Sequence, residues 1–386
     1  MKRPLLVVFF TVVLDLVGFG LVIPLLAFYA ESFQATPIQV TAMMTCFSLG
    51  QFFAAPLWGQ LSDKYGRRPL LLFSILMTAL SLFAFGSATE LWMLFVFRTL
   101  HGVMTANIAI AQACVADLTT PETRAKGMGL LGAGFGIGFT VGPFIGGELS
   151  QYGLAVPIYA AACLSLLNFA LGLVFLPETR VPGAASASRP ISPTALITAL
   201  RHPRAGLLIL LTFTYVFAFA AMESTFTLFA EHERGLEAKD VGRLFGAIGV
   251  VGAIVQGGLI HRLVKRFGEA PLIPPGMLLI ALGLVLLPIA PVGAPLLATF
   301  ALLAIGQGIA TPALQSLVSR SVSADEQGFI LGSNQSMGAV ARAFAPIAGG
   351  ALFAHVAHGM PFYASAALLV LSAALALKAT RAPSSS

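Results

Sequence analysis

Charged side chains are scarce in this sequence. Asp, Glu, Lys and Arg make up 10% of its 386 residues, whereas they make up about 25% of a typical soluble domain. Hydrophobic residues make up 57% of the chain. So few polar groups could not cover a soluble fold of this size, and large apolar patches would face water. The composition therefore excludes an ordinary soluble protein and indicates a protein embedded in lipid.

The period-two alternation of membrane barrel strands is also missing. In lipid the backbone must satisfy its own hydrogen bonds, which leaves helices and closed barrels as the structures that span a membrane. A helix needs about 20 predominantly apolar residues to cross the hydrocarbon core. The apolar runs of this chain are long and uninterrupted. They predict transmembrane helices.

Other absences exclude further classes of protein. The three cysteines lie far apart inside apolar segments, where we expect them to pack rather than form disulfides or bind a metal. The net charge of +6 is not concentrated in a basic domain, which argues against a nucleic-acid-binding protein. The first apolar run resembles a signal peptide, but Asp15 interrupts it and no A-x-A cleavage site follows. We therefore expect a retained first span.

Twelve apolar runs, divided six and six, predict an all-α polytopic membrane protein. Residues 1–180 and 206–386 would each form a six-helix bundle, joined by a Pro-, Ala- and Ser-rich cytoplasmic linker at 181–205. The predicted spans lie near residues 5–30, 38–62, 68–87, 90–116, 122–150, 153–176, 206–230, 240–261, 271–290, 293–318, 327–353 and 359–378.

The basic residues of the loops predict the orientation. If the N-terminus is cytoplasmic, nearly all loop Lys and Arg residues fall on the inner side, and the outer side holds only Arg234, Lys239 and Arg243. Basic residues accumulate in cytoplasmic loops of membrane proteins. We therefore expect both termini in the cytoplasm and a bacterial inner membrane as the location.

The two halves repeat a pattern of small residues. Parallel repeats of this kind are common in transporters. Four positions of the fifth span recur 203 residues later in the eleventh, and the paired sets are Gly129, Pro143, Gly146 and Gly147, and Gly332, Pro346, Gly349 and Gly350.

Several motifs carry a resemblance to a known family. Residues 59–68, GQLSDKYGRR, match the signature G-x-L-x-D-x-x-G-R-[KR] of the major facilitator superfamily, at the loop where that signature is expected. Arg98 and Gly102 match its R-x-x-x-G element, and the glycines and Pro143 of the fifth span are similar to its antiporter signature. Residues 15–24, DLVGFGLVIP, resemble the tetracycline-efflux group of drug/proton antiporters.

The sequence also departs from that family in two places. Position 84 is Ala84, where tetracycline exporters carry an acid. The second-half copy of the loop signature, residues 261–268, has lost the leading glycine and the aspartate.

The resemblance implies a conformational latch in the loop between the second and third spans. Asp63 would interact with the positive end of the eleventh span, where a helix N-terminus attracts a carboxylate, and Arg67 could pair with Asp117. Simple anchoring by cytoplasmic charge is the alternative. The residues assigned to the latch are Gly59, Asp63, Gly66, Arg67, Arg68, Asp117 and Arg124.

Asp15 is the leading candidate for proton coupling. An ionisable side chain at the bilayer centre costs several kcal/mol, so it is a functional candidate by default. Arg98 of the fourth span reaches a similar depth, and an ion pair between the two is geometrically possible. We expect Asp15 to exchange a proton and Arg98 to bias its pKa; the alternative is a fixed structural pair. His101, one turn away, is either a second titrating group or a packing residue.

Glu223 is the second carboxylate inside a span. It shares one helical stripe with three aromatic residues, which would favour lipophilic cations if the stripe lined a cavity. Packing of the stripe against a neighbouring helix is the alternative, and Arg342 could pair with Glu223. The residues expected to line the cavity are Phe19, Asn107, Tyr215, Phe219, Phe226, Gln315 and Arg342.

Glycines recur at every fourth position of the fifth span and leave one face nearly smooth. Small residues at this spacing let helices approach closely, and a proline permits a kink. This face suits either tight static packing or an interface that moves. The residues assigned to this hinge are Gly129, Gly138, Gly142, Pro143, Gly146 and Gly147.

These observations predict a proton-coupled antiporter that exports small lipophilic compounds, including cationic or zwitterionic ones, by alternating access. A symporter or facilitator for a sugar or metabolite on the same fold is the alternative. No motif of an enzyme is found, so we expect no catalytic residues. We expect no cofactor and no metal, since the proton gradient supplies the energy. The expected partners are the substrate, protons and the lipid bilayer, and we expect a monomer.

Overall fold

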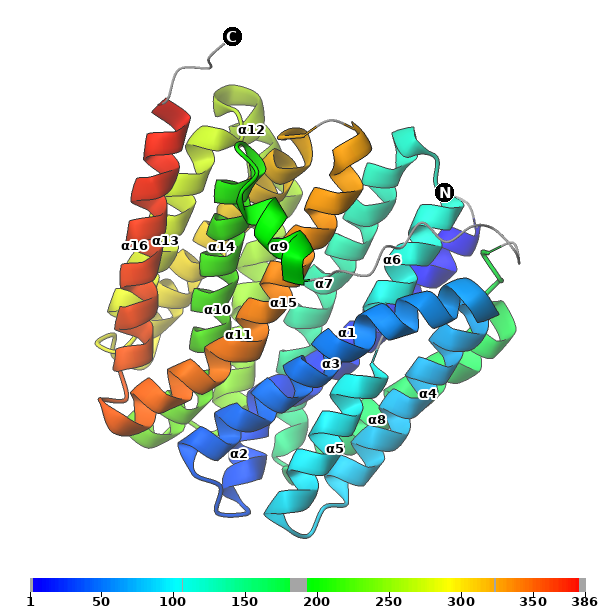
Figure 1. The fold of residues 1–386 in the computed structure, drawn as a ribbon. Helices are drawn as coiled ribbons and strands as arrows, with labels where there is room; N and C mark the ends of the chain where they lie inside the picture. Colours follow the sequence, from blue (N-terminus) through cyan, green and yellow to red (C-terminus); the bar gives the residue numbers. More distant parts are fainter. Residues whose placement is uncertain (1–2, 106, 181–192, 323, 382–386) are drawn as a thin grey trace. The chain divides into compact units, whose positions relative to one another are not determined.

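The computed structural model describes residues 3–105, 107–180, 193–322 and 324–381. Every regular element in these ranges is a helix (Figure 1). Eleven helical segments are long and apolar enough to cross a membrane, and a shorter apolar helix spans Ala270–Leu286. The predicted class, an all-α polytopic membrane protein with about twelve spans, is confirmed for the described part of the chain.

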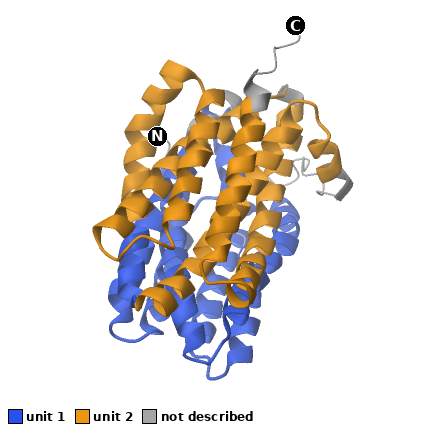
Figure 2. Ribbon diagram, turned by 90° about the vertical axis from the view of Figure 1, so that its left-hand side faces the viewer, with its two compact units in different colours: residues 1–190, 236–246 blue, residues 191–235, 247–386 orange. Residues whose placement is uncertain are grey.

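The helices form two compact units, coloured separately in Figure 2. Unit 1 contains residues 1–190 and 236–246, and unit 2 contains residues 191–235 and 247–386. Residues 181–192 of the predicted linker lie outside the described residues. The division differs from the sequence-based one mainly in residues 236–246, which pack in unit 1 instead of with the second bundle.

The first nine elements, all within residues 1–190, are α1 (Arg3–Val22), η1 (Ile23–Leu25), α2 (Leu26–Glu31), α3 (Pro37–Tyr65), α4 (Arg67–Gly86), α5 (Leu91–Met104), α6 (Asn107–Leu118), α7 (Pro121–Ser150) and α8 (Val156–Phe175). The remaining elements are α9 (Pro193–Leu200), α10 (Ala205–Arg234), α11 (Ala238–Ile254), η2 (Val255–Leu259), α12 (Ile260–Phe267), η3 (Ala270–Leu272), α13 (Ile273–Leu286), α14 (Ala294–Arg320), α15 (Ala324–His355) and α16 (Met360–Arg381).

The local sequence explains where several helices begin. Thr36 caps α3 in a capping box with Gln39, and Pro37 occupies the first helical turn. Thr120 caps α7 in the same way with Thr123. Such caps satisfy backbone N–H groups that the first turn of a helix leaves without partners. The turn between α3 and α4 is made by Gly66, whose φ of 100° favours glycine.

The predicted span near 90–116 is two helices, not one. α5 ends at Met104, and Thr105 has an extended backbone with φ −83° and ψ 97°. The carbonyl oxygens of Val103 and Met104 accept hydrogen bonds from Trp58 Nε1 and Ser74 Oγ, each over 2.7 Å. Neighbouring helices therefore supply the hydrogen bonds that the helix loses at its break, as lipid requires.

A second irregularity lies in the predicted span near 240–261. Residues Val255–Leu259 form a π-helical segment between α11 and α12. Val255 is buried, and its side chain packs against Gly308 of α14. π-Helical turns inside α-helices often mark functional sites. Apolar composition gives no signal for such a turn, which explains why the sequence predicted a plain helix here.

Helices α1 and α7 of unit 1 cross with their backbones in close approach. A Cβ at Gly142 of α7 would lie 2.7 Å from the Cα of Gly20 and 2.7 Å from the carbonyl oxygen of Val17. The same crossing in unit 2, between α10 and α15, uses alanines: Ala220, Ala221 and Ala345 pack together. Small residues thus allow close backbone approach at the corresponding crossing of each half.

The Gly142 crossing can be tested by adding one methyl group. In Gly142→Ala the new Cβ meets backbone atoms, which cannot move aside as a side chain can, so we expect the free energy of unfolding to fall by about 1–3 kcal/mol. Thermal unfolding of the purified protein in detergent measures the change.

Gly129 provides the matched control, since it lies in the same helix and a Cβ there would meet no atom within 4 Å. Gly129→Ala should leave stability unchanged or raise it by up to about 1 kcal/mol, because alanine favours the helix. Equal effects of the two substitutions would contradict the assigned crossing.

Candidate functional site

Asp15 lies buried in α1, with 8% of its surface exposed. Its Oδ1 accepts a hydrogen bond from Nδ2 of Asn107, the first residue of α6. The helix break before α6 therefore places a neutral amide against the carboxyl group. Asn107 is buried to 1% exposure, and its Oδ1 has no hydrogen-bond partner among the described residues. The sequence named both residues as candidates but gave no sign that they touch.

Arg98 does not pair with Asp15 in this structure, which corrects the predicted ion pair. The Arg98 guanidinium lies over the ring of Phe47, 4.4 Å from its centroid, and 6.0 Å from the centroid of Phe19. Its Nη1 lies 3.4 Å from Nδ1 of His101. Similar depth in the membrane is not enough for a contact, because the two side chains must also face each other around their helix axes.

The buried Arg98 cluster is thus aromatic instead of acidic. The ring of Phe47 packs edge-on against His101 with centroids 5.1 Å apart, and it also lies 5.5 Å from the ring of Phe19. Cation–π attraction partly replaces the missing anion for a desolvated guanidinium. The proposed cavity residue Phe19 therefore belongs to the immediate surroundings of Arg98.

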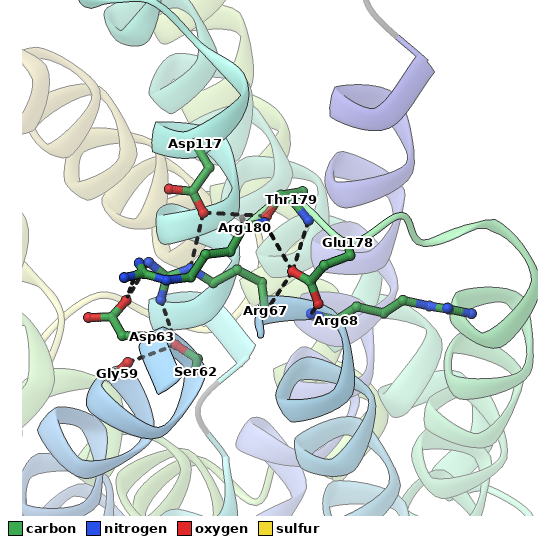
Figure 3. A network of polar contacts seen from close by, with 9 residues as sticks. All are labelled: Gly59, Ser62, Asp63, Arg67, Arg68, Asp117, Glu178, Thr179 and Arg180. Atoms are coloured by element: carbon green, nitrogen blue, oxygen red, sulfur yellow. Dashed lines mark hydrogen bonds and ion pairs between the residues drawn. The ribbon is translucent and has the colours of Figure 1, made fainter. Parts of the chain in front are cut away.

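The loop signature between α3 and α4 forms a network of charged contacts, drawn in Figure 3. Asp63 Oδ1 lies 2.6 Å from Arg67 Nη2 and 2.8 Å from Arg180 Nη1. Arg67 also donates from Nε to Asp117 Oδ2 over 3.1 Å and from Nη1 to Ser62 over 2.6 Å. The predicted Arg67–Asp117 pair is confirmed. Arg67 is buried, so these acids stabilise a positive charge that has been removed from water.

Glu178, just after α8, fixes the start of α4. Its Oε1 accepts from the backbone N–H of Arg67 over 2.9 Å, and its Oε2 accepts from that of Arg68 over 3.1 Å. Burial raises the pKa of Glu178, but backbone N–H groups of Arg180, Arg67, Arg68 and Thr179 donate to it and lower the pKa further than burial raises it. The net pKa lies below the ordinary value, so the carboxylate remains charged at neutral pH.

Sequence reasoning missed the part that residues 178–180 play in this network. It treated Arg180 only as an inner-side charge and did not single out Glu178. The available signal was an acid followed by Thr and Arg directly after an apolar run. Ser62 Oγ donates to the carbonyl of Gly59, so the leading glycine of the signature takes part through its backbone.

Two parts of the latch prediction stay predictions. The expected partner of Asp63 at the start of α15 belongs to unit 2, whereas its observed partners belong to unit 1. The side chain of Arg124 lies outside the described residues. Arg68 donates from Nη2 to the carbonyl of Leu173 and thus helps to join α4 to α8.

In unit 2, the aromatic stripe of α10 is only partly available to a ligand. The rings of Tyr215 and Phe219 are stacked with centroids 6.4 Å apart. Tyr215 Oη accepts a hydrogen bond from Thr311 of α14 over 2.8 Å. Phe219 and Glu223 are half-buried. These positions remain candidates for a surface that contacts substrate.

Phe226 corrects the prediction that it lines a cavity. Its side chain is 1% exposed, and its ring packs edge-on against Phe300 of α14 with centroids 4.7 Å apart. A helical stripe identifies the residues that share a face but not the point at which a neighbouring helix covers that face. Gln315 is exposed, and the structure gives it no role in a cavity.

Arg342 and Glu223 interact electrostatically without forming an ion pair within 4 Å among the described residues. Arg342 is exposed, and its Nη1 lies near Gly338 one turn earlier in α15. The pairing proposed from the sequence is therefore a longer-range interaction in this structure.

The glycines of α7 divide between two neighbours. Gly138, Gly142 and Gly146 face the backbone of α1, whereas Gly147 packs against Gly242 of α11. Next to this contact, Arg243 Nε lies 2.6 Å from Glu148 Oε1. Gly129 meets no neighbour, so it does not belong to either contact surface. Whether these residues act as a hinge stays a prediction, as does any role for Pro143, which lies inside α7.

Within the described ranges, no group of three or more His, Cys, Asp or Glu residues could hold a metal ion. The predicted site residues whose side chains are described gather in four polar regions: the Asp15–Asn107 pair, the Arg98 cluster, the inner-loop network and the Glu223 region.

Comparisons with known proteins agree with these features. The sequence profile of the Major Facilitator Superfamily matches residues 8–295 and 258–386. The chain is 33% identical to the class C tetracycline resistance protein of Escherichia coli over 384 residues, which cover 96% of this chain and 95% of that protein. It is 32% identical to multidrug resistance protein 1 of Bacillus subtilis (strain 168) over 369 residues, or 95% and 93% of the two chains.

Solved structures show the same fold. The crystal structure of the human organic anion transporter MFSD10 is similar with a TM-score of 0.75 at 25% sequence identity, covering 97% of this chain and 99% of that one. The nucleoside transporter NupG matches with a TM-score of 0.78 at 13% identity, covering 97% and 99% of the two chains. By its sequence profile, its relatives and its fold, this chain belongs to the major facilitator superfamily.

Proposed function

We propose that this protein is a proton-coupled antiporter that exports small lipophilic compounds, cationic or zwitterionic ones among them. The observation that carries the proposal is the buried Asp15, held by the neutral amide of Asn107 and not by a cation among the described residues. The names of the relatives, tetracycline and multidrug resistance proteins, support drug efflux as the direction and class of transport.

Asp15 is suited to exchange a proton because no cation of the described ranges forms an ion pair with it. An ionised carboxylate inside a membrane is costly unless it is paired. Protonation removes that charge, and a bound cationic substrate would remove it in another way. If proton and substrate compete for the same carboxyl group, the export of one requires the import of the other. Asn107 can hold the side chain in place in either state, because an amide donates to both forms.

The Glu223 region of unit 2 would supply a surface that contacts substrate. Phe219, which is half-buried one turn before Glu223, offers apolar area and a ring face, and the buried ring of Tyr215 stacks against it. Such a surface favours flat, lipophilic compounds and attracts a positive charge. Ala84 occupies the position where tetracycline exporters carry an acid, so the proposal includes multidrug substrates as well as tetracycline-like ones.

The inner-loop network would act as the latch of the transport cycle. Asp63, Arg67 and Arg180 are largely buried and tie the ends of α3, α4 and α8 together. Breaking and re-forming these pairs would give the chain two discrete states. The orientation that suits this proposal has both termini in the cytoplasm of a bacterial inner membrane, with the monomer as the transporting unit.

Asp15→Asn should abolish coupling while the protein stays folded, because the amide cannot release a proton. Inverted membrane vesicles with an acidic lumen provide the test. Adding tetracycline or the lipophilic cation tetraphenylphosphonium should cause proton efflux from the lumen with the wild type and none above background with the variant.

Asp240→Asn is the matched control, since Asp240 lies in the first turn of α11 outside the residues proposed for coupling, and an asparagine oxygen can still accept from the backbone N–H of Glu237. Asp15→Glu should restore part of the coupling by restoring a carboxyl group. Full coupling in Asp15→Asn would refute the proposed role. Proton uptake in the same direction as the substrate would instead support the symporter.

Asp63→Asn should slow transport several-fold and leave substrate affinity unchanged. The substitution removes the charge that pairs with both Arg67 and Arg180, and it leaves two largely buried guanidinium groups with fewer anions. Initial rates of export and equilibrium binding of the same probe separate the two quantities.

Glu237→Gln provides the comparison, because its pair with Lys239 over 3.0 Å is exposed. An exposed pair contributes about 0–1 kcal/mol, so this variant should transport at the normal rate. An Asp63→Asn protein that is as fast as Glu237→Gln would show that the network only anchors the loop.

A further inference from the structure

The two copies of the loop signature differ in the acids that they offer to their basic residues. In unit 1 the acids pair with two arginines: Asp63 contacts Arg67 and Arg180, and Asp117 contacts Arg67 as well. The copy in unit 2, residues 261–268, reads HRLVKRFG, and Lys265 stands at the position of Asp63. The second copy therefore carries a further cation where the first provides its acid.

These cations lie on one face of α12. His261, Arg262, Lys265 and Arg266 are all exposed, and their spacing of i, i+1, i+4 and i+5 places them within less than half of the helix circumference. The opposite face holds the apolar side chains Ile260, Leu263, Val264 and Phe267. α12, which ends this candidate membrane span and is labelled in Figure 1, is therefore basic on one side and apolar on the other.

The nearby acids whose side chains are described already have ion-pair or hydrogen-bond partners. Glu269, which follows α12, lies 2.9 Å from Arg320 and accepts a hydrogen bond from Ser316 over 3.1 Å. Glu326 of α15 lies 3.9 Å from His202. Among the described residues no ion pair joins an acid to Arg262, Lys265 or Arg266.

Glu269 stays charged and bound to its partners Arg320 and Ser316. Burial raises the pKa of Glu269, while its hydrogen bonds, including those from Ser316 and Arg320, lower the pKa by more, so the net pKa lies below the ordinary value. The carboxylate is thus charged and committed to α14.

The helix dipole offsets only part of the charge on α12. A helix C-terminus carries roughly half a negative elementary charge. Arg262, Lys265 and Arg266 carry three positive charges within a span of five residues. No ion pair within the described part of the chain offsets the remainder.

We propose that the basic face of α12 binds the headgroup of an anionic phospholipid. α12 is the end of the candidate span Ala238–Phe267, where headgroups meet the hydrocarbon core. Phe267 is 52% exposed, and the Arg266 guanidinium lies 5.2 Å from its ring centroid. An exposed aromatic ring next to two or more bases suits the boundary between acyl chains and phosphate groups. The adjoining apolar face favours a lipid over a free anion.

Arg262→Gln/Arg266→Gln should weaken the binding of phosphatidylglycerol about 25-fold, because each basic side chain near an anionic surface contributes about fivefold. Native mass spectrometry of the full-length protein in a neutral detergent, titrated with phosphatidylglycerol, measures the affinity. Phosphatidylcholine, which has no net charge, should bind the wild type far more weakly. Size-exclusion chromatography verifies that the variant remains folded.

Arg201→Gln/Arg204→Gln is the matched control, since it removes the same charge from exposed positions beside α9 and α10. It should bind phosphatidylglycerol like the wild type. Equal losses in the two double variants, or equal affinities for the two lipids, would overturn the proposal. Displacement of the lipid by millimolar inorganic phosphate would also overturn it, because the site would then recognise a phosphate and not a lipid headgroup.

Discussion

Hydrocarbon cannot hydrogen-bond to a polar group, and the structure of this chain depends on that constraint. Where α5 ends inside a span, side chains of neighbouring helices take over the hydrogen bonds that the backbone loses. Trp58 and Ser74 do so at the break before α6. The break also brings Asn107 into contact with Asp15. The same local structure therefore satisfies two carbonyl groups and gives the buried acid its hydrogen-bond partner.

Much of the fold could be predicted from the sequence, because hydropathy reports the solvent that each segment faces. The spans, the loop signature and the Arg67–Asp117 contact all followed from apolar runs and motifs. The helix break could not be predicted, since Thr105 lies in a run with no change in hydropathy. The partners of Asp15 and Arg98 depend on how α1 and α5 are rotated about their axes. The depth of a residue in the membrane, which the sequence predicts, does not define that rotation.

The sequence predicted many residues of the candidate site but few of the contacts that they make. Phe226 shares a stripe with Glu223, but Phe300 of a distant helix covers it. Glu178 lies more than 100 residues from the loop that it holds, so no local pattern links the two. The internal repeat has the same limit: small residues recur at the crossing of α1 with α7 and of α10 with α15, whereas Asp15 and the acids of the loop do not recur.

The assignment of residues 236–246 to unit 1 has a consequence for biogenesis. A ribosome releases the first six spans well before the start of α11 emerges, so Gly147 and Glu148 must wait for Gly242 and Arg243. Until then, the nascent first bundle presents an uncovered glycine surface and a carboxylate without its arginine to the lipid or to an insertion factor. A chain cut after residue 190 would never complete this bundle on its own, and co-expression of the remainder would be needed to supply the missing segment.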